Sequence, residues 1–199
     1  MTSANALPHD FQNCRNRKDH AGEDAPLSAG YTLERRTAER IDDLLALIEL
    51  CGEDMWRRLG LDHWKPPTPK EVFRDYARTK EVFAVHDARG LVATFTIGFD
   101  APEPYPPSCW ADISHKAIYL NKLAVLPTLQ GRGIGRWCME QIERLARERG
   151  CQSVRFDALT RNAPLLAFYD RLGYRRCGDM YVYDEIGRGW DIIVYEKVL

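Results

Sequence analysis

The chain has 199 residues, of which 45% are hydrophobic and 11% are aromatic, so it is long enough to bury the core of one domain. Its 28 basic and 29 acidic residues give a formal net charge of -1, which argues against the broad basic surface of nucleic-acid-binding proteins. No stretch approaches the ~20 consecutive apolar residues of a transmembrane helix, and the N-terminal region has no apolar signal-peptide core. We therefore expect a cytoplasmic protein without a nucleic-acid or membrane partner.

The cysteines and histidines do not indicate a metal site. The six cysteines are scattered without a C-x-x-C pair, and the five histidines show no ligand spacing relative to one another or to cysteine. We expect buried free thiols and no metal.

The first 30 residues are polar, mixed in charge and without hydrophobic periodicity, which predicts a poorly ordered tail. One domain is predicted over residues 31–199. It opens with an alternating strand at residues 31–36, and apolar residues at helical spacing then predict a helix from about Ile41.

An irregular lid is predicted over residues 52–68, because the adjacent prolines Pro66 and Pro67 break any long helix. A short helix is expected at about residues 69–78. Two strands follow, E-V-F-A-V-H and L-V-A-T-F-T-I-G-F, and the Ala-Arg-Gly run between them suits a tight hairpin. Residues 100–112 contain four prolines, which predicts a loop.

The second half alternates strands and helices. The run A-I-Y-L-N-K-L-A-V-L predicts a strand, and a helix with one apolar face is predicted from the glycines after it to Gly150. The strand S-V-R-F-D-A-L precedes a second helix, capped by Asn162 and ended by Gly173. Two more strands are predicted at residues 174–183 and 191–198.

The glycine-rich turn Q-G-R-G-I-G, residues 130–135, lies between a strand and a helix. Glycines let the backbone approach a ligand, and the helix start presents unpaired N–H groups, so an anion is expected to bind there. An ordinary glycine turn is the alternative. The missing Lys-Ser or Lys-Thr and the G-x-G-x-G spacing disfavour a nucleoside triphosphate and NAD. A dinucleotide site remains a weaker alternative, in which Asp157 would be the ribose-binding acid.

A second motif, N-A-P-L-L-A-F-Y-D-R-L-G-Y, contains Asn162, Tyr169 and Gly173. Together with L-A-V-L-P and Q-G-R-G-I-G, it resembles the GCN5-related N-acetyltransferase (GNAT) superfamily. The match covers residues 31–198 in element order and is specific in motif over residues 120–174. The resemblance implies a single α/β domain with a mixed, mostly antiparallel, twisted sheet of about six to seven strands and helices on both faces.

The resemblance also implies that acetyl-CoA lies in a splayed gap between the strand ending at Leu126 and the strand ending near Leu159. Tyr169 falls on the motif tyrosine that commonly protonates the CoA thiolate in that superfamily; a core aromatic is the alternative. The residues implied to bind the cofactor are Leu123, Ala124, Val125, Gln130, Gly131, Arg132, Gly133, Ile134, Gly135, Asn162 and Tyr169.

The acceptor amine must lose a proton, and the sequence offers no clear base. Strand alternation predicts that Tyr119 and Asn121 face the same side as Leu123, so both join Tyr169 as candidate catalytic residues, although neither is a good base. Asp112 and His115 in the preceding loop are the other candidates.

We expect acetyl transfer from acetyl-CoA to a primary amine, by direct attack in a ternary complex. A small-molecule acceptor is favoured, in a monomer or homodimer. A non-catalytic CoA-binding sensor and a protein N-terminal or lysine acetyltransferase remain alternatives. The acceptor pocket is expected to be partly apolar. Its predicted wall consists of the segments around Trp56, Trp64, Tyr105 and Trp110.

Overall fold

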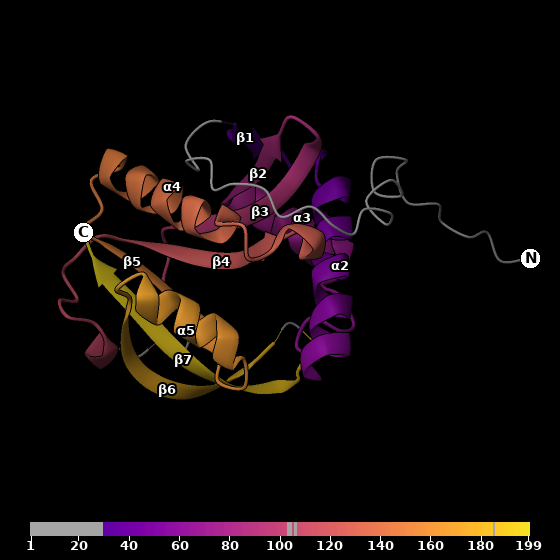
Figure 1. Ribbon diagram of the computed structural model, residues 1–199. Coiled ribbons are helices and arrows are strands. Elements are labelled where there is room, and N and C mark those ends of the chain that lie inside the picture. The colour runs from indigo at the N-terminus through magenta and orange to yellow at the C-terminus, as the bar shows by residue number, and fades with distance from the viewer. Residues whose placement is uncertain (1–29, 103–104, 106, 185) are drawn as a thin grey trace, which may run out of the picture.

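The computed structural model describes residues 30–102, 105, 107–184 and 186–199. In this part of the chain, seven strands form one sheet in the order β1-β2-β3-β4-β5-β7-β6 (Figure 1). The strands are β1 (Thr32–Arg36), β2 (Glu81–Asp87), β3 (Gly90–Gly98), β4 (Ala117–Val125), β5 (Ser153–Leu159), β6 (Arg175–Tyr183) and β7 (Gly189–Val198). The α-helices are α2 (Asp42–Leu59), α3 (Lys70–Thr79), α4 (Ile134–Glu148) and α5 (Ala163–Arg171).

The sheet is mixed and mostly antiparallel. Every described neighbouring pair runs antiparallel except β4 and β5. This confirms the predicted fold class and differs from the doubly wound parallel sheet that a dinucleotide site requires. The predicted tail falls almost wholly on residues 1–29, outside the described residues. No helix within the described part is both long and apolar enough to cross a membrane.

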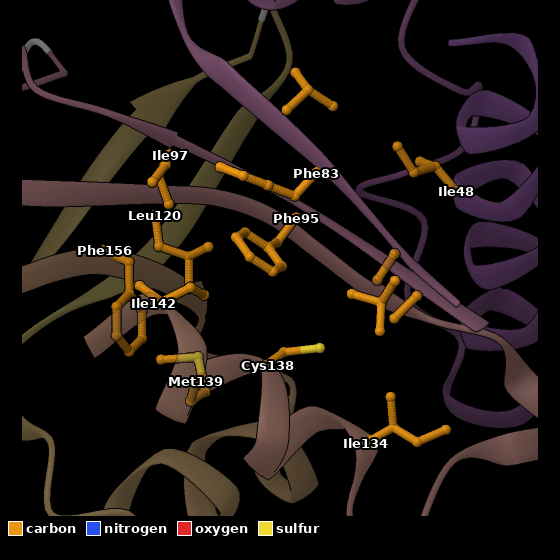
Figure 2. Packing of buried hydrophobic residues seen from close by; sticks show 14 of the residues in the cluster. Ile48, Phe83, Phe95, Ile97, Leu120, Ile134, Cys138, Met139, Ile142 and Phe156 are labelled. Carbon is orange, nitrogen blue, oxygen red and sulfur yellow. The ribbon is translucent and has the colours of Figure 1, made fainter. Parts of the chain in front are cut away.

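The centre of the sheet is covered on both faces. Residues 82–85 of β2 and 92–98 of β3 are buried without interruption, whereas a strand with one solvated face would alternate. Figure 2 shows a cluster of side chains from three strands and from α4: Phe95, Leu120, Phe156, Met139 and Ile142.

The first helix corrects the predicted lid. Helix α2 continues to Leu59 and ends at Gly60, which adopts a left-handed conformation, so residues 52–59 are helical. A Cβ atom at Gly52 would lie 2.7 Å from the backbone oxygen of Trp64. The glycine therefore does not break the helix, but lets the loop between α2 and α3 return close to it. The irregular segment is limited to about residues 60–69.

The other predicted helix signals hold. Asn162 caps α5, accepting a hydrogen bond from the Leu165 amide at 3.3 Å, and Gly173 follows the helix with a φ of 79°. The apolar face of α4 is buried as its periodicity predicts. Both helices therefore start from turns at the carboxyl ends of β4 and β5.

Candidate active site

The two halves of the sheet separate between β4 and β5. Their described pairing covers only Ala117–Tyr119 opposite Ser153–Arg155, although β4 continues to Val125 and β5 to Leu159. In Figure 1, β4 and the β7–β6 hairpin diverge toward α2. The gap lies where the resemblance to the GNAT superfamily implies it, and it leaves the β5-facing edge of β4 unpaired with β5 beyond Tyr119.

A β-bulge shapes β4 at the gap. Thr94 of β3 pairs with Ala124 while Thr96 pairs with Asn121, and Lys122 between them has a φ of 51°. The bulge interrupts the alternation of side chains along β4. Residues before and after Lys122 therefore do not share a face as strict alternation predicts.

The expectation that Tyr119 and Asn121 face the same side as Leu123 is wrong for both residues. Tyr119 and Asn121 lie two residues apart in regular register with β3, and the bulge that follows them turns Leu123 to the other face. Leu123 packs against the main core, whereas Tyr119 belongs to a second cluster with Trp110 on the opposite face. The Tyr119 hydroxyl accepts a hydrogen bond from Arg155 at 3.1 Å. Tyr119 therefore has a structural contact that strand alternation alone did not predict.

A cavity of about 930 Å³ occupies the gap and extends to the loop between α2 and α3. Most of the predicted site residues line it: Asn121, Leu123, Ala124, Val125, Gln130, Gly131, Gly133, Ile134, Gly135, Asn162 and Tyr169. Arg132 and Tyr119 do not. The structure thus brings together two motifs that lie about 30 residues apart in the chain.

The glycine turn at the start of α4 has the form of an anion cradle. Gly131 and Gly133 have φ values of 78° and 82°, which favour glycine. No side chain caps α4, so the N–H groups of its first turn are directed toward the cavity end of the helix. A Cβ at Gly135 would lie 3.3 Å from the ring of Phe168. Glycine here therefore also permits close packing of α4 against α5.

Gln130 connects the cradle to neighbouring elements. Its side chain donates to the Val125 carbonyl at 3.1 Å and accepts from Arg58 at 3.1 Å. The same carbonyl also accepts a hydrogen bond from the Cys51 thiol at 3.2 Å. These contacts fix the end of β4 against α2.

Tyr169 lies on α5 with its ring in the core and contributes to the cavity wall. The ring centroid is 4.4 Å from that of Phe156 and 5.1 Å from that of Phe168. Burial raises the pKa of its hydroxyl above the ordinary value, and the negative charge of Asp157 raises it further. Tyr169 is therefore protonated at neutral pH and able to donate a proton.

Asp157 faces the gap from β5. Alternation along β5 directs Arg155 and Asp157 to one face and Phe156, which contacts Tyr169, to the other. The Asp157 carboxylate accepts a hydrogen bond from the Tyr105 hydroxyl. The Asp157 side chain is exposed at the cavity surface, but the surrounding cavity walls partly desolvate the carboxyl group and raise its pKa, while the Tyr105 bond and the charge of Lys122 act to lower that pKa.

The sequence predicts a role for Asp157 only as the acid of a dinucleotide site. In the pattern F-D-A-L, a single carboxylate interrupts an apolar strand shortly before the second motif. A lone acidic residue at this position is the signal by which the sequence could have pointed to Asp157 as a site residue. Among the described residues, the cavity lining contains two carboxylates, Asp157 and Asp184.

Asp184 belongs to a hydrogen-bonded turn at the far end of the cavity. Partial burial acts to raise its pKa, but the backbone amide of Arg188, the Trp190 indole and the Arg188 guanidinium lower that pKa overall. This carboxylate is therefore engaged in holding the turn between β6 and β7.

Arg188 joins that turn to the loop between α2 and α3. Its guanidinium donates to the backbone oxygens of Asp62 and His63 at 3.1 Å and also to that of Lys65. His63 lines the cavity beside Trp64, and burial lowers the pKa of its imidazole to about 4. The far end of the cavity thus has a wall made of two distant segments, with a neutral imidazole at neutral pH.

The loop candidates for the base lie elsewhere. Asp112 and His115 do not line the cavity, and their side chains approach each other to 3.7 Å. Of the four aromatic residues expected at the acceptor pocket, Trp64 lines the cavity. Tyr105 reaches it indirectly through Asp157, while Trp110 lies in the second cluster and Trp56 is exposed.

No group of three potential ligands among His, Cys, Asp and Glu is placed to hold a metal ion within the described residues. The five cysteines in that part of the chain are free thiols. The cavity instead offers a glycine cradle, an unpaired strand edge, a phenol and a carboxylate.

Solved structures of known proteins resemble this arrangement. One is a GNAT family acetyltransferase from Listeria monocytogenes, 17% identical, with a TM-score of 0.65 over 85% of this chain and 95% of that chain. Another is the ribosomal-protein-S18-alanine N-acetyltransferase from Escherichia coli, 16% identical, with a TM-score of 0.62 over 84% and 93%. A third is a GNAT family acetyltransferase from Elizabethkingia anophelis with acetyl-CoA bound, 13% identical, with a TM-score of 0.59 over 86% and 99%.

These likenesses show the shared fold. Residues 44–174, which span both motifs and most of the residues that line the cavity, match the Acetyltransferase (GNAT) family. The chain therefore belongs to the GNAT family of acetyltransferases.

Proposed function

We propose that the protein transfers the acetyl group of acetyl-CoA to the primary amine of a small molecule, by direct attack within a ternary complex. One observation carries the proposal: a single cavity joins the glycine cradle to the gap between β4 and β5, where Asp157 and Tyr169 are both present. The cradle end suits a charged cofactor, and the far end suits an acceptor.

The residues at the cradle end fit acetyl-CoA. The uncapped start of α4 and its left-handed glycines favour the pyrophosphate, and the exposed Arg132 adds positive charge nearby. Backbone groups from Leu123 to Val125 would hold the pantetheine arm, with Asn162 at the start of α5. When bound, acetyl-CoA supplies the thioester carbon that an amine attacks.

Two side chains would move the protons. Asp157 takes one proton from the amine nitrogen as the C–N bond forms, and Tyr169 donates one to the sulfur as the C–S bond breaks. A carboxyl pKa raised by desolvation suits a base, and a protonated phenol suits an acid. Because Asp157 and Phe156 point to opposite faces of β5, acceptor and thioester would approach the gap from opposite faces of the sheet.

The wall at the far end favours a small acceptor. Arg188 ties the β6–β7 turn to the loop between α2 and α3, which narrows the space that a polypeptide would need. The Escherichia coli structure is of a ribosomal-protein-S18-alanine N-acetyltransferase, whose acceptor is a protein. The wall bridged by Arg188 is our reason for proposing a small acceptor instead.

The test is an acceptor screen with purified protein and acetyl-CoA, in which release of the CoA thiol is measured with small primary amines and with peptides. We expect turnover with small amines. Asp157→Asn should lower turnover by about 100-fold or more at neutral pH, whereas Asp179→Asn, on the exposed part of β6, should not.

Three results would contradict the proposal in different ways. Binding of CoA without turnover of any amine would support the sensor alternative. Turnover only with peptides would support a protein acetyltransferase. Full activity of Asp157→Asn would remove Asp157 as the base.

A further inference from the structure

The loop between β3 and β4 is fixed to the sheet by a buried ion pair. Arg155 and Glu196 are each 2% exposed, and the guanidinium Nε donates to the Glu196 carboxylate at 3.0 Å. Arg155 also donates to the Asp112 backbone oxygen at 2.8 Å, and Glu196 accepts from the Ala111 amide at 2.7 Å. Two successive residues of the loop are therefore held by β5 and β7.

Aromatic packing extends this anchor to Tyr105. The Arg155 guanidinium lies 4.5 Å from the centre of the Trp110 ring, whose centroid is 5.7 Å from that of Tyr105. The Tyr105 ring also lies 6.4 Å from that of Tyr119 on β4. The phenol is thus positioned by contacts on its ring, which leaves its hydroxyl directed at Asp157.

We infer that Tyr105 is a positioning residue for Asp157: its hydroxyl holds carboxylate oxygen Oδ2 and directs Oδ1 to the acceptor. The inference rests on the proposed function, because that function gives Asp157 its role as a base. The hydrogen bond from Tyr105 to Asp157 is present in the structure whatever the function. Arg155 and Asp157 lie two residues apart on one face of β5. The same strand therefore anchors the loop between β3 and β4 through Arg155 and accepts the hydrogen bond from Tyr105 of that loop through Asp157.

The contact also sets the protonation of the carboxylate. Two ionisable groups act on the pKa of Asp157, Tyr105 from the loop and Lys122 from β4, while its partner on β7 is the uncharged Val194. Tyr169 on α5 lies against the opposite face of β5, although the charge of Asp157 acts on its hydroxyl. A hydrogen bond to the ionised form lowers a carboxyl pKa. Loss of the Tyr105 hydroxyl should therefore raise the pKa of Asp157, so that a larger fraction is protonated and unable to act as a base near neutral pH.

The decisive measurement does not depend on turnover. Aspartate labelled with ¹³C at the carboxyl carbon is titrated by NMR in the wild type and in Tyr105→Phe, with Asp157→Asn to assign the signal. Tyr105→Phe keeps the ring contacts, and we expect Asp157 to titrate about one pH unit higher. Tyr181→Phe, on the exposed face of β6, removes a hydroxyl elsewhere and should leave the titration unchanged.

The pH dependence of kcat/KM supplies the second measurement once an acceptor is known. The acidic limb should shift upward in Tyr105→Phe by the same amount as the NMR titration. An Asp157 titration that does not move, in a variant with a native circular dichroism spectrum, would overturn the inference. If no amine is acetylated but the NMR shift is found, the proposed function fails and the contact stands.

Discussion

Replacing Tyr169 with phenylalanine tests whether its hydroxyl acts in catalysis or whether the residue only packs in the core. The ring packs against Phe156, Phe168 and Tyr195, and these contacts remain in the variant. None of the described hydrogen bonds involves the Tyr169 hydroxyl, so its removal breaks no described bond within the protein. We therefore expect the free energy of unfolding to change by less than about 0.5 kcal/mol, which is a shift in Tm of roughly 2 °C at most.

Turnover should respond very differently. If the hydroxyl protonates the departing thiolate, kcat should fall by roughly 10- to 1000-fold, equivalent to about 1.4–4 kcal/mol of transition-state stabilisation. The Kd of acetyl-CoA should change little, because the hydroxyl acts only as the C–S bond breaks.

The assay follows CoA thiol release with an amine that the wild type acetylates, with calorimetry for acetyl-CoA affinity and thermal unfolding for stability. Tyr181→Phe is the matched control, since its ring is largely exposed outside the cavity. Wild-type kcat in Tyr169→Phe would refute the assignment and leave the residue a role in the core alone.

Three further predictions concern the cradle, the far turn and the buried ion pair. CoA at a hundredfold excess over its Kd should add ~2.7 kcal/mol of stability in thermal unfolding, and NAD and ATP much less; Gly133→Glu should abolish this gain, whereas Gly150→Glu, with a similarly positive φ outside the cavity, should retain it. Because the pKa of Asp184 is lowered in the folded state, its stabilisation is present above the unfolded value of ~3.9 and is lost as the pH falls through the folded pKa. Asp184→Asn should therefore destabilise the protein more at pH 7 than at pH 3 in urea unfolding, and equal losses at both would contradict this. Arg155→Met should cost about 3 kcal/mol and lower Tm by roughly 6–12 °C, and adding Glu196→Met should recover part of that loss; an unchanged Tm in the single variant would be evidence against the buried pair as an anchor.

The sequence predicts elements whose signals are local. Periodicity locates the strands and α4, and the caps at Asn162 and Gly173 define α5. The sequence predicts the glycine cradle and Tyr169 as site residues because each lies in a compact motif. The seven-stranded mixed sheet follows from the resemblance that those motifs carry.

The errors arise where contacts between distant segments decide the local structure. Gly52 lies within a continuous helix, where it permits the close approach of Trp64 from the following loop. The residue type alone does not indicate this contact. The bulge at Lys122 depends on how β3 pairs with β4, so alternation placed Tyr119 and Asn121 on the wrong face relative to Leu123. The bond from Tyr105 to Asp157 joins residues 52 positions apart, and no local pattern predicts it.

The bridge made by Arg188 has a consequence for redesign of the enzyme. Because one guanidinium binds three backbone oxygens of the loop between α2 and α3, the shape of the far end of the cavity depends jointly on residues 62–65 and on Asp184, Arg188 and Trp190. A loop transplanted alone from a relative would lose its counterpart and leave polar backbone groups without their donor. Exchange of acceptor preference between relatives should therefore require both segments to be transferred as a matched pair.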